Sequence, residues 1–251
     1  MRALDTPTLL DAWDRGHSLS ADAWALWLLR AAAACETGSP DALLQWPVGR
    51  RDRALLRLRS LTFGTRIAGL VECPRCANAA EFDVAADALV VPHASGEDAA
   101  ALRFEMRFDI DGLRVVGRAV TAGDLLAIDT QADLHSASGL LADCCVSAYR
   151  HDGTRVAAAD LPEPVLAAIV ARLEELDPQA DLWITMACPD CDHTWQVNFD
   201  IVTFFWRELG AWAMGQLRDV HDLASVYGWS EAQILSLSPA RRRCYLRMLT
   251  P

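Results

Sequence analysis

The sequence predicts an α+β fold, in which a zinc-ribbon-like β element carries a large α/β insertion and is flanked by N- and C-terminal helices. Two C-P-x-C motifs, at residues 73–76 and 188–191, each lie between runs of β-type residues. The segment between the motifs contains a hairpin signal and helical periodicities, and the stretches outside them are helical in pattern. We therefore expect the two motifs to meet in space, although they are far apart along the chain.

This pattern divides the 251-residue chain into four segments. We expect an N-terminal helical region at 1–64, a split zinc ribbon at 65–84 and 182–200, an inserted hairpin with helices at 85–181, and a C-terminal helical region at 201–251. No internal repeat appears beyond the two cysteine motifs.

The N-terminal region should contain helices at 8–15, 21–34 and 50–63. Gly16 is expected to end the first of them as a C-cap. In the third, the leucines, Leu61 included, should face the core and the arginines should face the solvent.

In the insertion, residues 85–100 are predicted to form a loop or linker, and the alternating stretch 102–119 predicts a hairpin that turns at Asp111 and Gly112. The expected helices of this segment and of the C-terminal region lie at 122–129, 136–149, 165–176, 201–227, 230–237 and 239–249. Asp200 is positioned to cap the longest of them.

Four cysteines form the strongest chemical signal in the chain: Cys73, Cys76, Cys188 and Cys191. Four thiolates in two close pairs suit one tetrahedral structural zinc ion, whose closed coordination shell leaves no position for catalysis. A cytosolic redox or metal-handling role is the main competing interpretation, but redox C-x-x-C pairs normally begin a helix, whereas extended residues follow both pairs here. Plain free thiols are the remaining interpretation.

Composition limits the possible functions. A net charge of −11 argues against a nucleic-acid partner, because binding to phosphates requires positive charge. No apolar run is long enough to span a bilayer and no signal peptide is evident, so we expect a cytoplasmic protein without a membrane partner. No nucleotide-binding or hydrolase motif occurs, so we predict no catalytic residues and no enzymatic activity.

The C-terminal helices carry a candidate partner-binding set: Trp206, Trp212, Trp229, Arg241, Arg242 and Arg243. Tryptophan and arginine are enriched in protein interfaces, and nine tryptophans are many for this length. Ordinary core packing of the tryptophans remains the alternative.

Several strings resemble a known family. They include LQWPVGRRD at 44–52, CPDCDHTW at 188–195, YGWSE at 227–231 and SPARRR at 238–243. Together they are similar to baseplate-associated proteins of contractile phage tails and contractile injection systems, a family distantly similar to the T-even phage baseplate hub assembly protein.

The resemblance implies a protein of tail or baseplate assembly, whose partners would be hub, spike or tape-measure proteins. Such a protein would act in the cytoplasm or within a phage-tail-like particle, as a permanent component or as an assembly chaperone. The expected zinc ion rests on the cysteine spacing of this chain and not on the resemblance.

Overall fold

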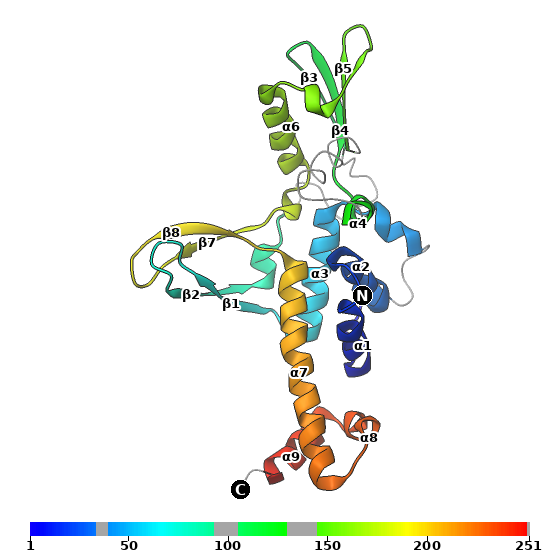
Figure 1. Ribbon diagram of the computed structural model, residues 1–251, viewed down its shortest axis with the longest axis vertical. Coiled ribbons are helices and arrows are strands. Elements are labelled where there is room, and N and C mark those ends of the chain that lie inside the picture. The colour runs from blue at the N-terminus through cyan, green and yellow to red at the C-terminus, as the bar shows by residue number, and fades with distance from the viewer. Residues whose placement is uncertain (34–39, 93–104, 130–144, 250–251) are drawn as a thin grey trace.

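The computed structural model describes residues 1–33, 40–92, 105–129 and 145–249. It is an α+β fold with a central helical body, a β arm on one side, a sheet lobe at one end and a helical tail at the other (Figure 1).

The helices of the body and tail are α1 (Thr6–Gly16), α2 (Ala21–Ala33), α3 (Val48–Phe63), α4 (Ala122–Asp129), α7 (Ile201–Tyr227), α8 (Glu231–Ser236) and α9 (Pro239–Leu249). The arm consists of β1 (Arg66–Glu72), β2 (Ala79–Ala85), β7 (Trp183–Ala187) and β8 (Thr194–Asn198). The lobe consists of β3 (Glu105–Ile110), β4 (Leu113–Arg118), β5 (Val146–Arg150), β6 (Arg155–Val156) and α6 (Glu163–Leu176). Short 3₁₀ turns lie at Pro40–Gln45, Ala86–Leu89, Ala158–Asp160 and Pro178–Ala180.

The body is built where α1, α2, α3 and the first half of α7 pack together (Figure 1). Trp24 and Phe205 are fully buried at its centre, with their rings edge to face at 5.8 Å. The Trp24 indole donates a hydrogen bond of 2.9 Å to the carbonyl of Ala12, so the buried ring leaves no polar atom unpaired. Asp200 caps α7 as expected, because its carboxylate accepts from the backbone N–H of Val202.

The expectation for α3 is wrong at both of its ends. Leu61 is 47% exposed, whereas Arg51 and Arg59 are only 4% and 2% exposed. The two arginines can be buried because carboxylates from other helices reach them: Asp22 of α2 pairs with Arg51, and Glu208 of α7 pairs with Arg59. A helical pattern in one segment cannot reveal partners supplied by distant ones.

Gly16 is not the left-handed cap that its position suggested. The helix includes Gly16, and the following residue, His17, has a right-handed φ of −73°. A Cβ atom at Gly16 would lie 2.2 Å from the ring of Trp206, so glycine is needed here for the close approach of α7 to α1.

The sheet lobe has strand order β3-β4-β5-β6 with antiparallel pairing throughout. The predicted hairpin is confirmed, since Asp111 and Gly112 turn the chain with φ values of 51° and 75°. The helix expected at 136–149 is wrong at its end, because Val146–Arg150 pairs with β4 as strand β5. Residues 136–144 of that expected helix lie outside the described residues.

The stretch 85–100, predicted as a loop, begins with structure of its own. It continues β2 to Ala85 and then forms a 3₁₀ turn whose Ala86 and Leu89 are buried. This turn packs on the body through contacts with α3, and the remainder from residue 93 lies outside the described residues.

Candidate metal centre and the adjacent groove

The two cysteine motifs fold into matching turns at the ends of two hairpins, β1–β2 and β7–β8. Cys73 N–H donates to the carbonyl of Asn78 at 2.9 Å, and Cys188 N–H donates to that of His193 at 2.9 Å. The residue after each second cysteine has a left-handed backbone, with φ of 59° at Ala77 and 54° at Asp192. Two segments far apart in sequence therefore present their thiols in the same local geometry.

The four sulfur atoms converge where the hairpin tips meet. All four Sγ atoms lie within 4.8 Å of one another, with 3.7 Å between Cys73 and Cys191 and 3.6 Å between Cys76 and Cys188. Four sulfurs bound tetrahedrally at about 2.3 Å from one ion would lie about 3.8 Å apart. The arrangement can therefore hold a metal ion without a large movement of the chain.

The cluster favours ionisation at one sulfur and disfavours it at two others. Burial alone would raise the pKa of Cys73, but backbone N–H groups of the turn stabilise its thiolate and bring the pKa to about 7. The N–H of Asn78 favours the thiolate of Cys76, yet burial and the adjacent thiols raise its pKa to about 12, and the pKa of Cys191 is also raised. A cation at the centre would offset the repulsion between neighbouring thiolates and so favour several of them together.

His193 lies beside the cluster and is not one of its members. Its ring stacks on Trp195, with centroids 5.9 Å apart and an interplanar angle of 7°. Within the described residues, the four cysteines are the one group of His, Cys, Asp and Glu side chains arranged to hold a metal ion.

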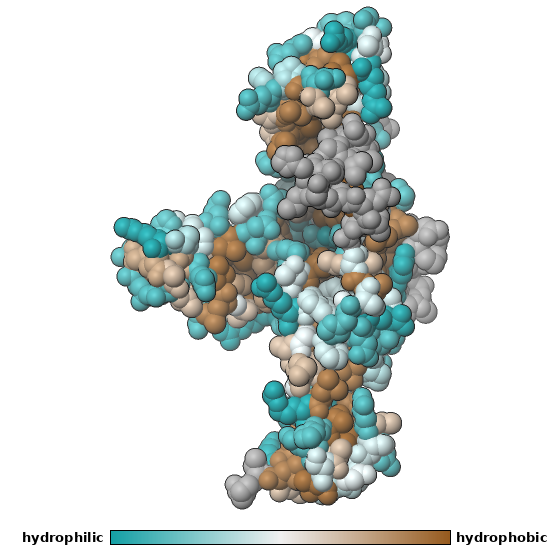
Figure 2. All heavy atoms as spheres, in the orientation of Figure 1, coloured by the Kyte–Doolittle hydropathy of each residue, from teal (hydrophilic) through white to brown (hydrophobic). Residues whose placement is uncertain are grey.

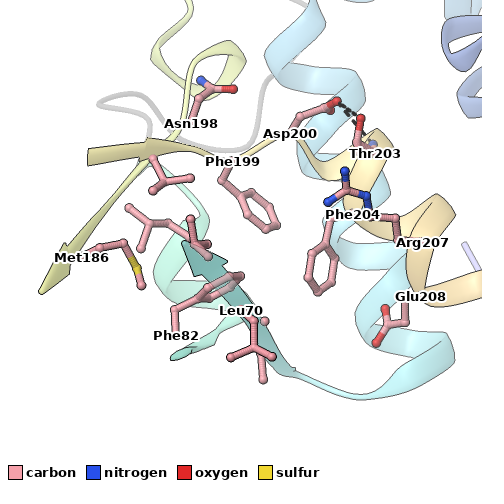
Figure 3. Close-up of a pocket in the computed structure, with 15 residues that line it drawn as sticks. Leu70, Phe82, Met186, Asn198, Phe199, Asp200, Thr203, Phe204, Arg207 and Glu208 are labelled. Carbon is pink, nitrogen blue, oxygen red and sulfur yellow. Dashed lines mark hydrogen bonds between the residues drawn. The ribbon is translucent and has the colours of Figure 1, made fainter. Parts of the chain in front are cut away.

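A groove of about 570 Å³ lies between the two hairpins and the start of α7 (Figure 3). Phe82, Met186, Phe199 and Phe204 give it a mostly apolar lining, in which Leu70 lies beside Phe82. Figure 2 shows apolar side chains gathered on the arm between its tip and the body. The two hairpins form walls of the groove, and the cysteine cluster lies where the tips of these hairpins meet.

Charged side chains border the groove on the α7 side. Glu208 accepts two hydrogen bonds from Arg59, at 2.7 and 2.5 Å, and Asp200 accepts from the hydroxyl of Thr203 at 2.5 Å. Arg207 is exposed beside them and forms no ion pair within the described part of the chain.

The predicted partner-binding residues divide into two groups. Trp206 packs edge to face on Trp24 at 5.4 Å, and Trp212 contacts Phe63 at 6.3 Å, so both contribute to the body. In the tail, Trp229 stacks on Tyr227 at 4.7 Å. Arg242 is 4% exposed, whereas Arg241 and Arg243 are exposed. Their role in binding a partner stays a prediction.

Sequence reasoning missed the Arg59–Glu208 pair and the groove. The pair joins residues 149 positions apart, and no local pattern signals such a contact. The exposed Leu70 was hidden within an apolar run that predicted only a strand.

The fold and the cluster define an α+β protein with a four-cysteine centre able to hold a metal ion. A family model described as T4 bacteriophage base plate protein matches residues 30–206, more than two thirds of the chain. The chain belongs to this family, which confirms the resemblance found in the sequence. No curated protein and no solved structure matches it. No helix among the described residues is both long and apolar enough to cross a membrane.

Proposed function

We propose that this chain is a non-enzymatic structural component or assembly chaperone of a contractile, phage-tail-like baseplate. It acts by binding hub, spike or tape-measure proteins. Its membership of the T4 bacteriophage base plate protein family carries this proposal. Incorporation into a tail particle, or action in the cytoplasm before assembly, follows from that role.

The ion in the four-cysteine centre is zinc in this proposal. Four sulfur ligands in two close pairs suit zinc, and they leave no open position for a substrate. Zinc would hold hairpin β1–β2 against hairpin β7–β8 and convert metal affinity into folding free energy. Its role is therefore to support the arm and groove that bind a partner.

A thiol–disulfide function is the competing proposal. Both cysteine pairs lie in hairpin turns, whereas redox pairs normally use a helix N-terminus to lower a thiol pKa. Metal analysis with thiol titration separates the two. One tightly held zinc per chain with four protected thiols supports the structural role, and a metal-free protein that cycles between thiol and disulfide contradicts it.

The baseplate role is tested by deleting the gene in a host that makes contractile particles. We expect incomplete tails, restored by the wild-type chain and by a Cys244→Ser chain, since Cys244 is exposed and lies outside the cluster. Mass spectrometry of purified particles then distinguishes the two forms of the proposal. A component remains in finished particles, whereas a chaperone occurs only with assembly intermediates. Normal particle yield and infectivity after deletion would contradict both.

A further inference from the structure

Strand β1 has a free edge that opens into the groove. Among the described residues it pairs with β2 alone. Hydrogen bonds at the two ends of this ladder determine which residues of β1 form hydrogen bonds with β2. Ala86 N–H donates to the carbonyl of Thr65, and Cys73 N–H donates to that of Asn78. Because hydrogen-bonded pairs alternate along an antiparallel ladder, the N–H and C=O groups of Ala68 and Leu70 point away from β2.

This edge lies at the surface of the groove. Four consecutive residues of β1, 68–71, line the groove. Successive side chains of a strand point to opposite faces, so a groove lined by consecutive residues runs along the strand edge. The backbone groups of Ala68 and Leu70 are therefore available to a further strand.

The middle of the β1 edge also lacks the usual protection against pairing, since its exposed charged residues, Arg66 and Glu72, lie at the two ends of the strand. Leu70, at its middle, is 67% exposed, and Ala68 beside it is exposed as well. Strand β3, at the edge of the four-stranded sheet, instead exposes Glu105, Arg107 and Asp109. Charged residues on an edge oppose pairing with other chains, whereas a long apolar edge invites it. Of these two edges, the one beside the groove is therefore the one suited to accept another strand.

The chemistry of the groove specifies the side chains of an occupant. Phe82 and Phe204 provide apolar surface for alternate side chains of an extended segment (Figure 3). Glu208 is engaged by Arg59, and Asp200 by the N-terminus of α7, so Arg207 is the cation of the described lining that has no ion pair. A carboxylate is its complement.

We propose that an extended, acidic and apolar segment of a partner protein adds to β1 as a third strand and fills this groove. Main-chain hydrogen bonds to Ala68 and Leu70 hold the segment, and a carboxylate on it pairs with Arg207. The identity of the partner protein rests on the proposed baseplate function, whereas the binding of an extended segment in the groove does not depend on it. A second copy of the chain is the other occupant that such an edge could take, and sedimentation distinguishes the two below.

The test uses zinc-loaded full-length protein and synthetic peptides as long as β1. The probe alternates valine and glutamate, and its comparator alternates valine and lysine. Two further probes carry N-methyl groups on alternate amides. In one probe all the methyl groups lie along one edge of the extended peptide, and in the other they lie along the opposite edge. We expect one N-methylated probe and the lysine probe to bind about tenfold more weakly than the parent, measured by fluorescence anisotropy. The probe methylated on its other edge should bind like the parent.

Two substitutions locate the site. Leu70→Glu should weaken binding of the glutamate probe about tenfold, and Arg207→Glu should reverse the preference between glutamate and lysine probes. Val170→Glu, at an exposed apolar position of α6, is the matched control and should bind like wild type. Circular dichroism verifies that each variant is folded.

Equal binding of all the probes, or unchanged binding of the glutamate probe by Leu70→Glu, overturns the proposal. A wild-type dimer in sedimentation that Leu70→Glu dissociates also overturns it, because the occupant is then a second copy. Probe binding with normal particle assembly after gene deletion removes the baseplate role and leaves the groove. Failed particle assembly without probe binding supports the baseplate role and removes the groove proposal.

Discussion

Single residues determine the geometry of the cysteine centre. Ala77 and Asp192 occupy equivalent positions in the two turns and share a left-handed backbone that non-glycine residues seldom adopt. This conformation turns the chain so that the carbonyl of the next residue, Asn78 or His193, accepts from the N–H of the first cysteine of its motif at 2.9 Å. The backbone strain thus orients the sulfur ligands.

Removal of one ligand should open the centre. We expect Cys73→Ser to lose the metal and to lower the free energy of unfolding by about 4 kcal/mol, because a cross-link between distant segments is lost. Elemental analysis and the melting temperature measure both effects. Cys244→Ser should change neither. A Cys73→Ser protein with full metal content and unchanged melting temperature would contradict a single four-cysteine site.

Arg59 shows how a buried charge depends on its partner. Its side chain is 3% exposed and pairs with Glu208 through two hydrogen bonds. We expect Arg59→Met to lower the free energy of unfolding by about 3 kcal/mol, because it leaves the Glu208 carboxylate without that partner. Urea denaturation measures the loss. Arg57→Met, at an exposed position of the same helix, should stay within about 0.5 kcal/mol of wild type.

Asp52 should make stability depend on pH. Burial raises its pKa to about 6 against the opposing pull of Arg51, and the charges of Asp200 and Asp177 add to the rise. The folded state therefore binds the proton more tightly than the unfolded state, whose pKa is about 3.9. The stabilisation that Asp52 contributes is fully present below about pH 3.9 and is lost as the pH rises through about 6.

From pH 7 to pH 5, wild type should gain about 1 kcal/mol relative to Asp52→Asn, which cannot titrate. Urea denaturation of both proteins at the two pH values measures this difference. Parallel pH dependence of the two proteins would show that Asp52 does not carry the effect.

At the scale of elements, close helix contacts override local propensity. Gly16 lies inside α1 beneath the Trp206 ring, whereas a Cβ atom added at Gly215 of α7 would have no neighbouring atom within 4 Å. We expect Gly16→Ala to lower the free energy of unfolding by about 2 kcal/mol through overpacking, although alanine favours helix. Gly215→Ala should raise it by about 0.5 kcal/mol. Thermal unfolding distinguishes the signs, and stabilisation by both changes would show that α1 and α7 are not in close contact.

Elements with strong local signals were predicted well. The capping side chains of Asp200 and Ser230 and the Asp111–Gly112 turn confirm α7, α8 and the β3–β4 hairpin. Strand β5 was missed because its residues can form either structure, and pairing with β4 decides between them. The contacts of another element, not the local sequence, fixed this choice.

At the scale of the whole molecule, the part of the chain that the structure describes forms two apolar cores. One joins α1, α2, α3 and α7 around Trp24 and Phe205, and the other joins the four-stranded sheet to α6 around Val115 and Val165. Separate cores allow the sheet lobe to open without unfolding of the body.

Val115→Ala tests this independence. It removes a fully buried side chain, so we expect a loss of about 2 kcal/mol and faster hydrogen exchange in β3, β4 and β5. Exchange in α3 should remain as in wild type. Val116→Ala, at the half-buried neighbouring position on the opposite face, should have a smaller effect. Equal acceleration in α3 would show that the two cores unfold together.

The sequence by itself determined the α+β class, most helix and strand positions, the four candidate ligands and the family. These depend on local periodicity, capping residues and motif spacing, which are properties of short segments. Tertiary structure alone decided the convergence of the four sulfurs, the burial of Arg51 and Arg59, and the groove beside the free edge of β1. Each of these arises because a segment from a distant part of the chain supplies the missing partner.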